Sequence, residues 1–259
     1  NVMEKEKILV YDGSFNGFLT SVFIAFDEKI NVVNIQRKNE AQKGLFTDTQ
    51  TILTQVPKAK RVWDGISRRS NHVMKNIYFA FLSETAGVEY LLYSYIKEIV
   101  AKDSPGHLGL AEDMASKINH LANMVSKKKS QMEAFMRFNV STDGIHYSIS
   151  RPEFNLLPLV SKHFRSNFRD RQWVIYDIKR NYGLFYDLHN IQLITLDSME
   201  IVANYGAFNN SFQTNTSGAI EMWNAYFAKN PVKSLISDNS RTHQLNKQPG
   251  KYEEELEAV

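Results

Sequence analysis

The fold of this chain is decided by residues 132–187, which read MEAFMRFNVSTDGIHYSISRPEFNLLPLVSKHFRSNFRDRQWVIYDIKRNYGLFYD. Asp143-Gly144 stands between two strand-like runs, Phe138–Val140 and Ile145–Ile149. An Asp-Gly pair in that setting is a strong short-range signal for a β-hairpin. The segment also holds the densest mixture of Arg, His, Trp and Tyr in the chain, so we expect any chemistry to lie here.

Between this hairpin and a second one, the sequence predicts a short helix. Apolar side chains recur at helical spacing through Leu156–Phe168, at positions 157, 160, 164 and 168. Two further strand-like runs begin at Trp173 and at Leu184, and residues 181–183 are expected to form the turn between them. Side chains alternate along the first of these strands, so Trp173 and Ile175 should lie on one face of the sheet.

The rest of the chain is predicted to be mainly helical before this segment. Ile8–Tyr11 reads as a short buried strand, Ser14 is placed to cap the helix that follows, and residues 48–57 are expected to turn into a helical region. We predict an α+β fold in a single domain over residues 1–247. Its largely helical N-terminal half, about 1–135, is packed with a C-terminal antiparallel sheet and helices over 136–247, and residues 248–259 form an acidic C-terminal tail.

Composition excludes several classes of protein. The 259 residues are 43% hydrophobic and 23% charged, which fits a globular protein with a substantial core. There are 0 cysteines, so the chain has no disulfide and no thiolate ligand for zinc or for an iron–sulfur cluster. No apolar run approaches the roughly 18 residues of a membrane span. We therefore expect a protein of the reducing cytoplasm that does not enter a membrane.

The familiar cofactor and metal motifs are absent from the sequence. It contains no Walker phosphate loop, no dinucleotide glycine fingerprint, no HExxH and no GxSxG, and no two histidines have the i, i+4 spacing of helical metal ligands. We therefore predict no cofactor and no metal. A metal site assembled from distant residues, such as His163 with Asp177, is the alternative.

Positive charge is concentrated in two segments, although the net charge is only +3. The first segment contains Lys58, Lys60, Arg61, Arg68, Arg69 and Lys75, and the second contains Lys162, Arg165, Arg169, Arg171, Lys179 and Arg180. In the second segment aromatic residues are interleaved with the cations. Arg and Lys neutralise phosphates and aromatic faces stack on bases, so this composition suits nucleic acid. The alternative is a sheet core with a charged exterior.

For this nucleic-acid site the candidate residues are Arg137, Arg165, Arg169, Arg171, Trp173, Lys179 and Tyr182. A second hypothesis is a hydrolase or nuclease-like enzyme that uses His163, Asp177 and Arg180, which requires the three side chains to converge in one pocket. Burial of Asp177 in a closed ion pair, with Arg180 or Arg137, would argue against it. For His163 the structural role is favoured, because nothing near it in the sequence fixes a catalytic partner. A third hypothesis is a structural adaptor without affinity for DNA.

Several motifs together resemble a bacterial family described as probable DNA metabolism protein. They are VYDGSFNGFLTSVFIAF from Val10, MRF at Arg137-Phe138, HF at His163-Phe164 and WVIYDIKRNYG from Trp173, in which Asp177, Arg180, Tyr182 and Gly183 match the family pattern. Towards the C-terminus, Asp238 and Ser240 stand where the family pattern has Arg and Asn.

The resemblance implies a function and a partner. Members of that family are encoded beside a DNA modification or repair radical SAM protein, and some are fused to a uracil-DNA glycosylase-like domain. We therefore expect an accessory protein of DNA modification or repair that binds DNA and acts with a radical SAM protein. A chain without cysteine leaves the iron–sulfur cluster of that reaction to the partner.

Overall fold

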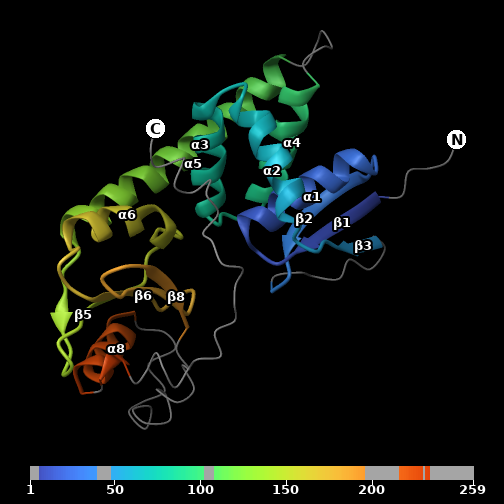
Figure 1. The fold of residues 1–259 in the computed structure, drawn as a ribbon. Coiled ribbons are helices and arrows are strands. Elements are labelled where there is room, and N and C mark those ends of the chain that lie inside the picture. Colours follow the sequence, from blue (N-terminus) through green and yellow to red (C-terminus); the bar gives the residue numbers. More distant parts are fainter. Residues whose placement is uncertain (1–5, 40–47, 102–107, 196–215, 230, 234–259) are drawn as a thin grey trace, which may run out of the picture. The chain divides into compact units, whose positions relative to one another are not determined.

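The computed structural model describes residues 6–39, 48–101, 108–195, 216–229 and 231–233, and Figure 1 shows their helices and strands. The chain divides into two compact units, Asn1–Ser126 and Lys127–Val259. The predicted α+β class is confirmed, with helices dominating the N-terminal half. The single domain over residues 1–247 stays a prediction, and the acidic tail at 248–259 lies outside the described residues. Among the described helices, none is long and apolar enough to cross a membrane.

A small parallel sheet forms the centre of the first unit. β1 (Glu6–Tyr11) lies between β2 (Asn31–Arg37) and β3 (Asp48–Thr51) and pairs in parallel with both. The prediction of a turn at residues 48–51 was wrong, because this segment is the strand β3. Its sequence, DTQT, is polar and lies at the edge of the sheet, so it shows no apolar alternation that would reveal a strand.

Helices make up the remainder of the first unit. They are α1 (Phe15–Asp27), α2 (Val56–Ser67), α3 (Asn71–Leu82), α4 (Val88–Val100) and the first part of α5 (Leu108–Phe135). The predicted cap of α1 is confirmed, since the Gly17 amide donates to Ser14 Oγ over 3.0 Å. Aromatic rings from α1 and α3 then form a common core, with the Phe15 ring 4.9 Å from Tyr78 and 5.0 Å from Phe81.

Gly17 brings the start of α1 close to the strand ends beside it. Asp12 Oδ2 accepts from Thr54 Oγ1 over 2.7 Å, and its Oδ1 accepts from the Ser14 hydroxyl over 2.7 Å. A Cβ on Gly17 would overlap the Asp12 carboxylate and would lie 2.9 Å from Thr54 Oγ1. Glycine is therefore required here by the close approach of side chains.

The second unit contains a five-stranded sheet with the order β4-β5-β6-β7-β8. The strands are β4 (Asn139–Val140), β5 (His146–Ser150), β6 (Trp173–Asp177), β7 (Tyr182–Tyr186) and β8 (Ile191–Ile194). Both predicted hairpins are present, as the antiparallel pairs β4–β5 and β6–β7. The turn predicted at residues 181–183 was wrong, because Tyr182 pairs with Asp177 and Gly183 with Tyr176, so that the turn covers residues 178–181. The sheet is mixed rather than wholly antiparallel, because β5 and β6 are parallel. Parallel neighbours need a crossover, and α6 (Leu157–Asn167) supplies it.

The two faces of this sheet carry separate cores. Trp173 and Ile175 of β6 pack with residues of α6, whereas Val174 and Tyr176 pack with residues of α8 (Thr216–Lys229). The predicted alternation along β6 is therefore confirmed. The unit has three layers, with α6 on one face of the sheet and α8 on the other, and every residue of β6 is buried.

Replacing Gly183 with alanine should destabilise the second unit. A Cβ on this β7 residue would lie 2.6 Å from Tyr176 Cδ2 and 2.8 Å from the Ile175 carbonyl oxygen. The backbone oxygen cannot move without disturbing the strand, so we expect a loss of about 1–3 kcal/mol in urea unfolding followed by tryptophan fluorescence. As a control, Gly65→Ala in α2 meets nothing within 4 Å and should leave stability unchanged or slightly higher. An unchanged midpoint for Gly183→Ala would contradict the packing described.

Candidate nucleic-acid interface

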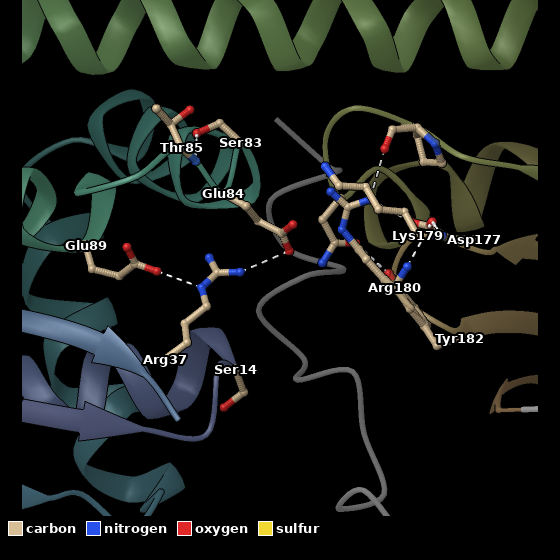
Figure 2. A network of polar contacts seen from close by, with 12 residues as sticks. Ser14, Arg37, Ser83, Glu84, Thr85, Glu89, Asp177, Lys179, Arg180 and Tyr182 are labelled. Atoms are coloured by element: carbon tan, nitrogen blue, oxygen red, sulfur yellow. Dashed lines mark hydrogen bonds and ion pairs between the residues drawn. The ribbon is translucent and has the colours of Figure 1, made fainter. Parts of the chain in front are cut away.

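The end of β6 is closed by an ion pair that sequence analysis had proposed as a possible catalytic site. Arg180 Nη1 lies 2.7 Å from Asp177 Oδ2, and the amides of Lys179 and Arg180 donate to Asp177 Oδ1 over 2.9 and 3.3 Å. Figure 2 shows the three side chains at the start of the β6–β7 turn. The Asp177 side chain is fully buried and that of Arg180 is 10% exposed.

Arg180 also contacts the segment between β5 and α6. Its Nη1 and Nη2 donate to the carbonyl oxygens of Pro152 and Glu153 over 3.2 and 3.1 Å, and Lys179 Nζ donates to the Glu153 carbonyl over 2.8 Å. The hydroxyl of Tyr182 contacts Asn155 Oδ1 at 2.5 Å. Arg180, Lys179 and Tyr182 therefore connect the β6–β7 turn to the segment before α6, and their polar groups have partners within the fold.

The pKa of the Asp177 carboxyl reflects its burial and its pairing with Arg180. Burial raises the pKa of the Asp177 carboxyl above its ordinary value, while the Arg180 guanidinium and the two backbone amides partly offset the rise. A carboxylate that is fully enclosed and paired in this way has no surface to offer a substrate.

His163 does not join the pair. Its Nδ1 lies 4.0 Å from Glu133 Oε1, and its ring packs against the edge of Phe164 with centroids 5.1 Å apart. Within the described residues no contact links His163 to Asp177 or Arg180, and no group of three or more His, Asp or Glu side chains is arranged to hold a metal ion. The structure therefore gives no support to a catalytic site made from His163, Asp177 and Arg180.

Trp173 was also proposed as a base-stacking residue, and the structure corrects this. The side chain is 0% exposed and lies between the Phe164 ring, 6.3 Å away, and the Tyr186 ring, 5.4 Å away. It is the centre of the core beneath α6, so it cannot present a face to a base. Arg171, two residues earlier, precedes the strand and is exposed.

Five of the predicted cations lie on the exposed side of α6 and its neighbouring loops, and we call them the α6 surface. They are Arg137, Lys162, Arg165, Arg169 and Arg171, all of which are exposed. Two of them have partners, since Arg165 Nη2 donates to the His189 carbonyl over 3.3 Å and Arg171 forms two hydrogen bonds to Asp170 of 3.0 and 2.7 Å. The other three form no ion pair or side-chain hydrogen bond with the described part of the chain.

Contacts of the Phe168 ring connect the two segments of the chain that carry these cations. The Phe168 ring lies 6.0 Å from the Arg171 guanidinium and 5.2 Å from the Phe138 ring, which follows Arg137 directly in sequence. Arg169 is held at the same corner, because its carbonyl lies 3.5 Å from the Tyr186 hydroxyl. These contacts connect the segment that carries Arg137 with the segment that carries Arg171, so the α6 surface includes cations from two segments of the chain.

The first basic segment is engaged by contacts within its own unit. Lys58 and Arg61 lie over the Phe23 ring, and Lys60 pairs with Asp64 at 3.0 Å. The remaining cations also have contacts: Arg68 with the Asp64 carbonyl, Arg69 with the Ile99 carbonyl and Lys75 with the Phe79 ring. Every cation of this segment thus has an intrachain contact, whereas Arg137, Lys162 and Arg169 of the α6 surface have no side-chain partner in the described part of the chain.

Sequence analysis missed a second buried ionic cluster, around Arg37 at the end of β2. Arg37 Nε lies 2.7 Å from Glu89 and its Nη1 lies 3.0 Å from Glu84, and Glu89 also accepts from the Tyr11 hydroxyl over 3.0 Å. Figure 2 shows Arg37 between the two glutamates. Burial raises the pKa of Tyr11, and the Glu89 charge adds to the rise, so the phenol stays a neutral donor. Arg37 is 26 positions from Tyr11 and 47 and 52 positions from Glu84 and Glu89, and no local pattern joins them. The cluster ties β1 and β2 to α4 and to the turn before it.

Comparison with known families gives one match. Residues 86–257, more than half of the chain, match a family described as a domain of unknown function (DUF4130). A search of curated proteins found no match. The matched region contains all five cations of the α6 surface and both members of the Asp177–Arg180 pair, and it begins after α3.

Removing Arg180 should make stability depend on pH in a specific direction. In Arg180→Met the buried Asp177 carboxylate loses its partner, so its pKa rises further above the ordinary 3.8. The folded state then binds a proton more readily than the unfolded state, and the stability of the variant falls as pH rises through that window. We expect a loss of about 3–5 kcal/mol at neutral pH, and a smaller loss near pH 4, in urea titrations.

A double variant separates charge from packing in that experiment. In Asp177→Asn with Arg180→Met no carboxylate is left unpaired, so its loss of stability should not vary between acid and neutral pH. If Arg180→Met were equally destabilised at both pH values, the ion pair would not be the source of the effect.

Proposed function

The chain belongs to the DUF4130 family, and we propose that it binds nucleic acid through the α6 surface, as an accessory protein of DNA metabolism. The observation that supports this proposal is that three cations of the α6 surface are exposed and unpaired within the described part of the chain. Arg137, Lys162 and Arg169 are exposed and have no side-chain partner in the described part of the chain, whereas the cations of α2 and α3 are used by the fold.

Charge density argues for a polyanion as the ligand. Residues 161–172 contain four cations and one acid, and that acid, Asp170, is already paired with Arg171. A duplex or single strand carries a regular row of phosphates, and each one that is neutralised releases counterions. Binding of this kind is independent of sequence and sensitive to salt. It requires no catalytic group, in keeping with the buried Asp177.

A salt series tests the proposal. Fluorescence anisotropy with a labelled oligonucleotide should give an association constant that falls steeply with salt concentration. In the triple variant Arg137→Gln, Lys162→Gln, Arg169→Gln, the slope of log K against log salt should become shallower by roughly two to three, because about one unit is lost for each phosphate contact. These residues are exposed, so folding should be retained.

The control removes the same charge elsewhere. Lys38, Lys97 and Lys117 are exposed lysines of the first unit, and their triple replacement by glutamine should leave the slope unchanged. Equal effects of the two triple variants would mean that net charge alone attracts the DNA, and no binding at low salt would remove the proposal.

We also propose that the protein acts with a radical SAM protein. The support is the resemblance of the segments around Arg137, His163 and Trp173 to proteins encoded beside such an enzyme. The composition is in keeping with this proposal, because these 259 residues contain 0 cysteines and supply no thiolate ligand for an iron–sulfur cluster.

Co-elution tests this partnership. When the purified protein is mixed with a cluster-loaded radical SAM protein from the neighbouring gene, iron–sulfur absorbance should move to a larger species that contains both chains. Because this chain has no thiolate, that absorbance reports the partner alone. Separate elution at micromolar concentrations of both proteins would contradict a stable complex, whatever the result of the DNA titration.

A further inference from the structure

Phe135, the last residue of α5, is an aromatic side chain that makes no ring contact with the described part of the chain. It is 77% exposed, whereas the next most exposed aromatic residues in the described part of the chain, Tyr90 and Phe26, are 40% and 38% exposed. Its neighbours Met132 and Met136 turn inward and pack against the core beneath α6. The direction of Phe135 is therefore fixed by a well-packed helix end.

Two cations of the α6 surface, Arg137 and Arg171, are connected to the segment that follows this ring. Arg137 is exposed and lies two residues after Phe135 in the chain. The next residue, Phe138, packs on the Phe168 ring, and the Arg171 guanidinium lies over that same ring. Phe135 thus lies at the border of the α6 surface defined above.

An aromatic face beside unpaired cations matches one ligand in particular. Single-stranded nucleic acid offers bases that can stack on an aromatic ring while the adjacent phosphates contact Arg and Lys, and such stacking tolerates any base. In a duplex the faces of the bases are already stacked on one another, so only the phosphates remain for the protein.

We propose that Phe135 is a base-stacking residue and that the preferred ligand of the α6 surface is single-stranded nucleic acid. This inference rests on the proposed function and specifies its substrate. A protein partner is the less favoured occupant, because protein-docking patches are contiguous apolar areas of several hundred Å². Arg137, two residues after Phe135, is exposed and positively charged, so charge complementarity favours a polyanion.

The experiment compares an oligothymidine with a duplex of equal length at one fixed salt concentration, by fluorescence anisotropy. Wild type should bind the single strand more tightly than the duplex. Phe135→Ala should weaken binding of the single strand about five- to 100-fold while leaving duplex binding and the salt slope unchanged. Phe135→Trp keeps a stacking face, so it should retain the affinity, and its added indole fluorescence should be quenched on binding.

A matched control comes from the same helix. Leu110 is 63% exposed near the other end of α5, so Leu110→Ala removes a similar apolar side chain without touching the α6 surface and should change nothing.

The outcomes separate the two proposals. If single strand and duplex bind equally and Phe135→Ala changes neither, the stacking role is overturned and the binding function stands. If wild type binds no oligonucleotide, both proposals fail. If Phe135→Ala instead abolishes self-association or complex formation with the radical SAM protein, without effect on DNA, the ring is a protein contact and the inference is overturned.

Discussion

The second unit depends on a single buried ion pair. Asp177 closes the last position of β6, accepts from two backbone amides of the turn and pairs with Arg180. Through Arg180 the pair also fixes the carbonyls of Pro152 and Glu153, just before the crossover helix α6. A buried carboxylate is costly unless its partners are complete, so the turn and the crossover must form together.

The position of α6 follows from that constraint. Its inner face, with Leu157, Val160 and Phe164, covers Trp173 in the centre of the sheet. Its outer face then presents Lys162 and Arg165 to solvent, and the exposed loop after it adds Arg169 and Arg171. Geometry therefore divides the cations of this segment: Arg180 is buried and paired with Asp177, whereas the cations of the α6 surface are exposed to solvent.

Sequence reasoning recovered part of the candidate site. The cluster of cations around α6 was identified from composition, because runs of Arg and Lys need no tertiary information. Sequence analysis also grouped Trp173 and Arg180 with these cations, because a sequence shows which residues are near one another in the chain but not which of them are buried. Phe135 was missed for the same reason: at helical spacing beside two methionines, an apolar side chain is expected to face the core, and only the packing shows that it does not.

The sequence by itself determined the local structure of this protein: the Asp143-Gly144 hairpin, the β6–β7 hairpin, the cap at Ser14 and the alternation along β6 all arise from interactions within a few residues. Only the tertiary structure decided how those pieces combine. The strand β3 forms because β1 provides a parallel partner for it. β5 runs parallel to β6 because the crossover helix α6 connects the two strands along the chain. The Arg37 cluster likewise joins residues far apart in the chain. Such pairings are selected by the burial of distant groups against one another, which no local pattern contains.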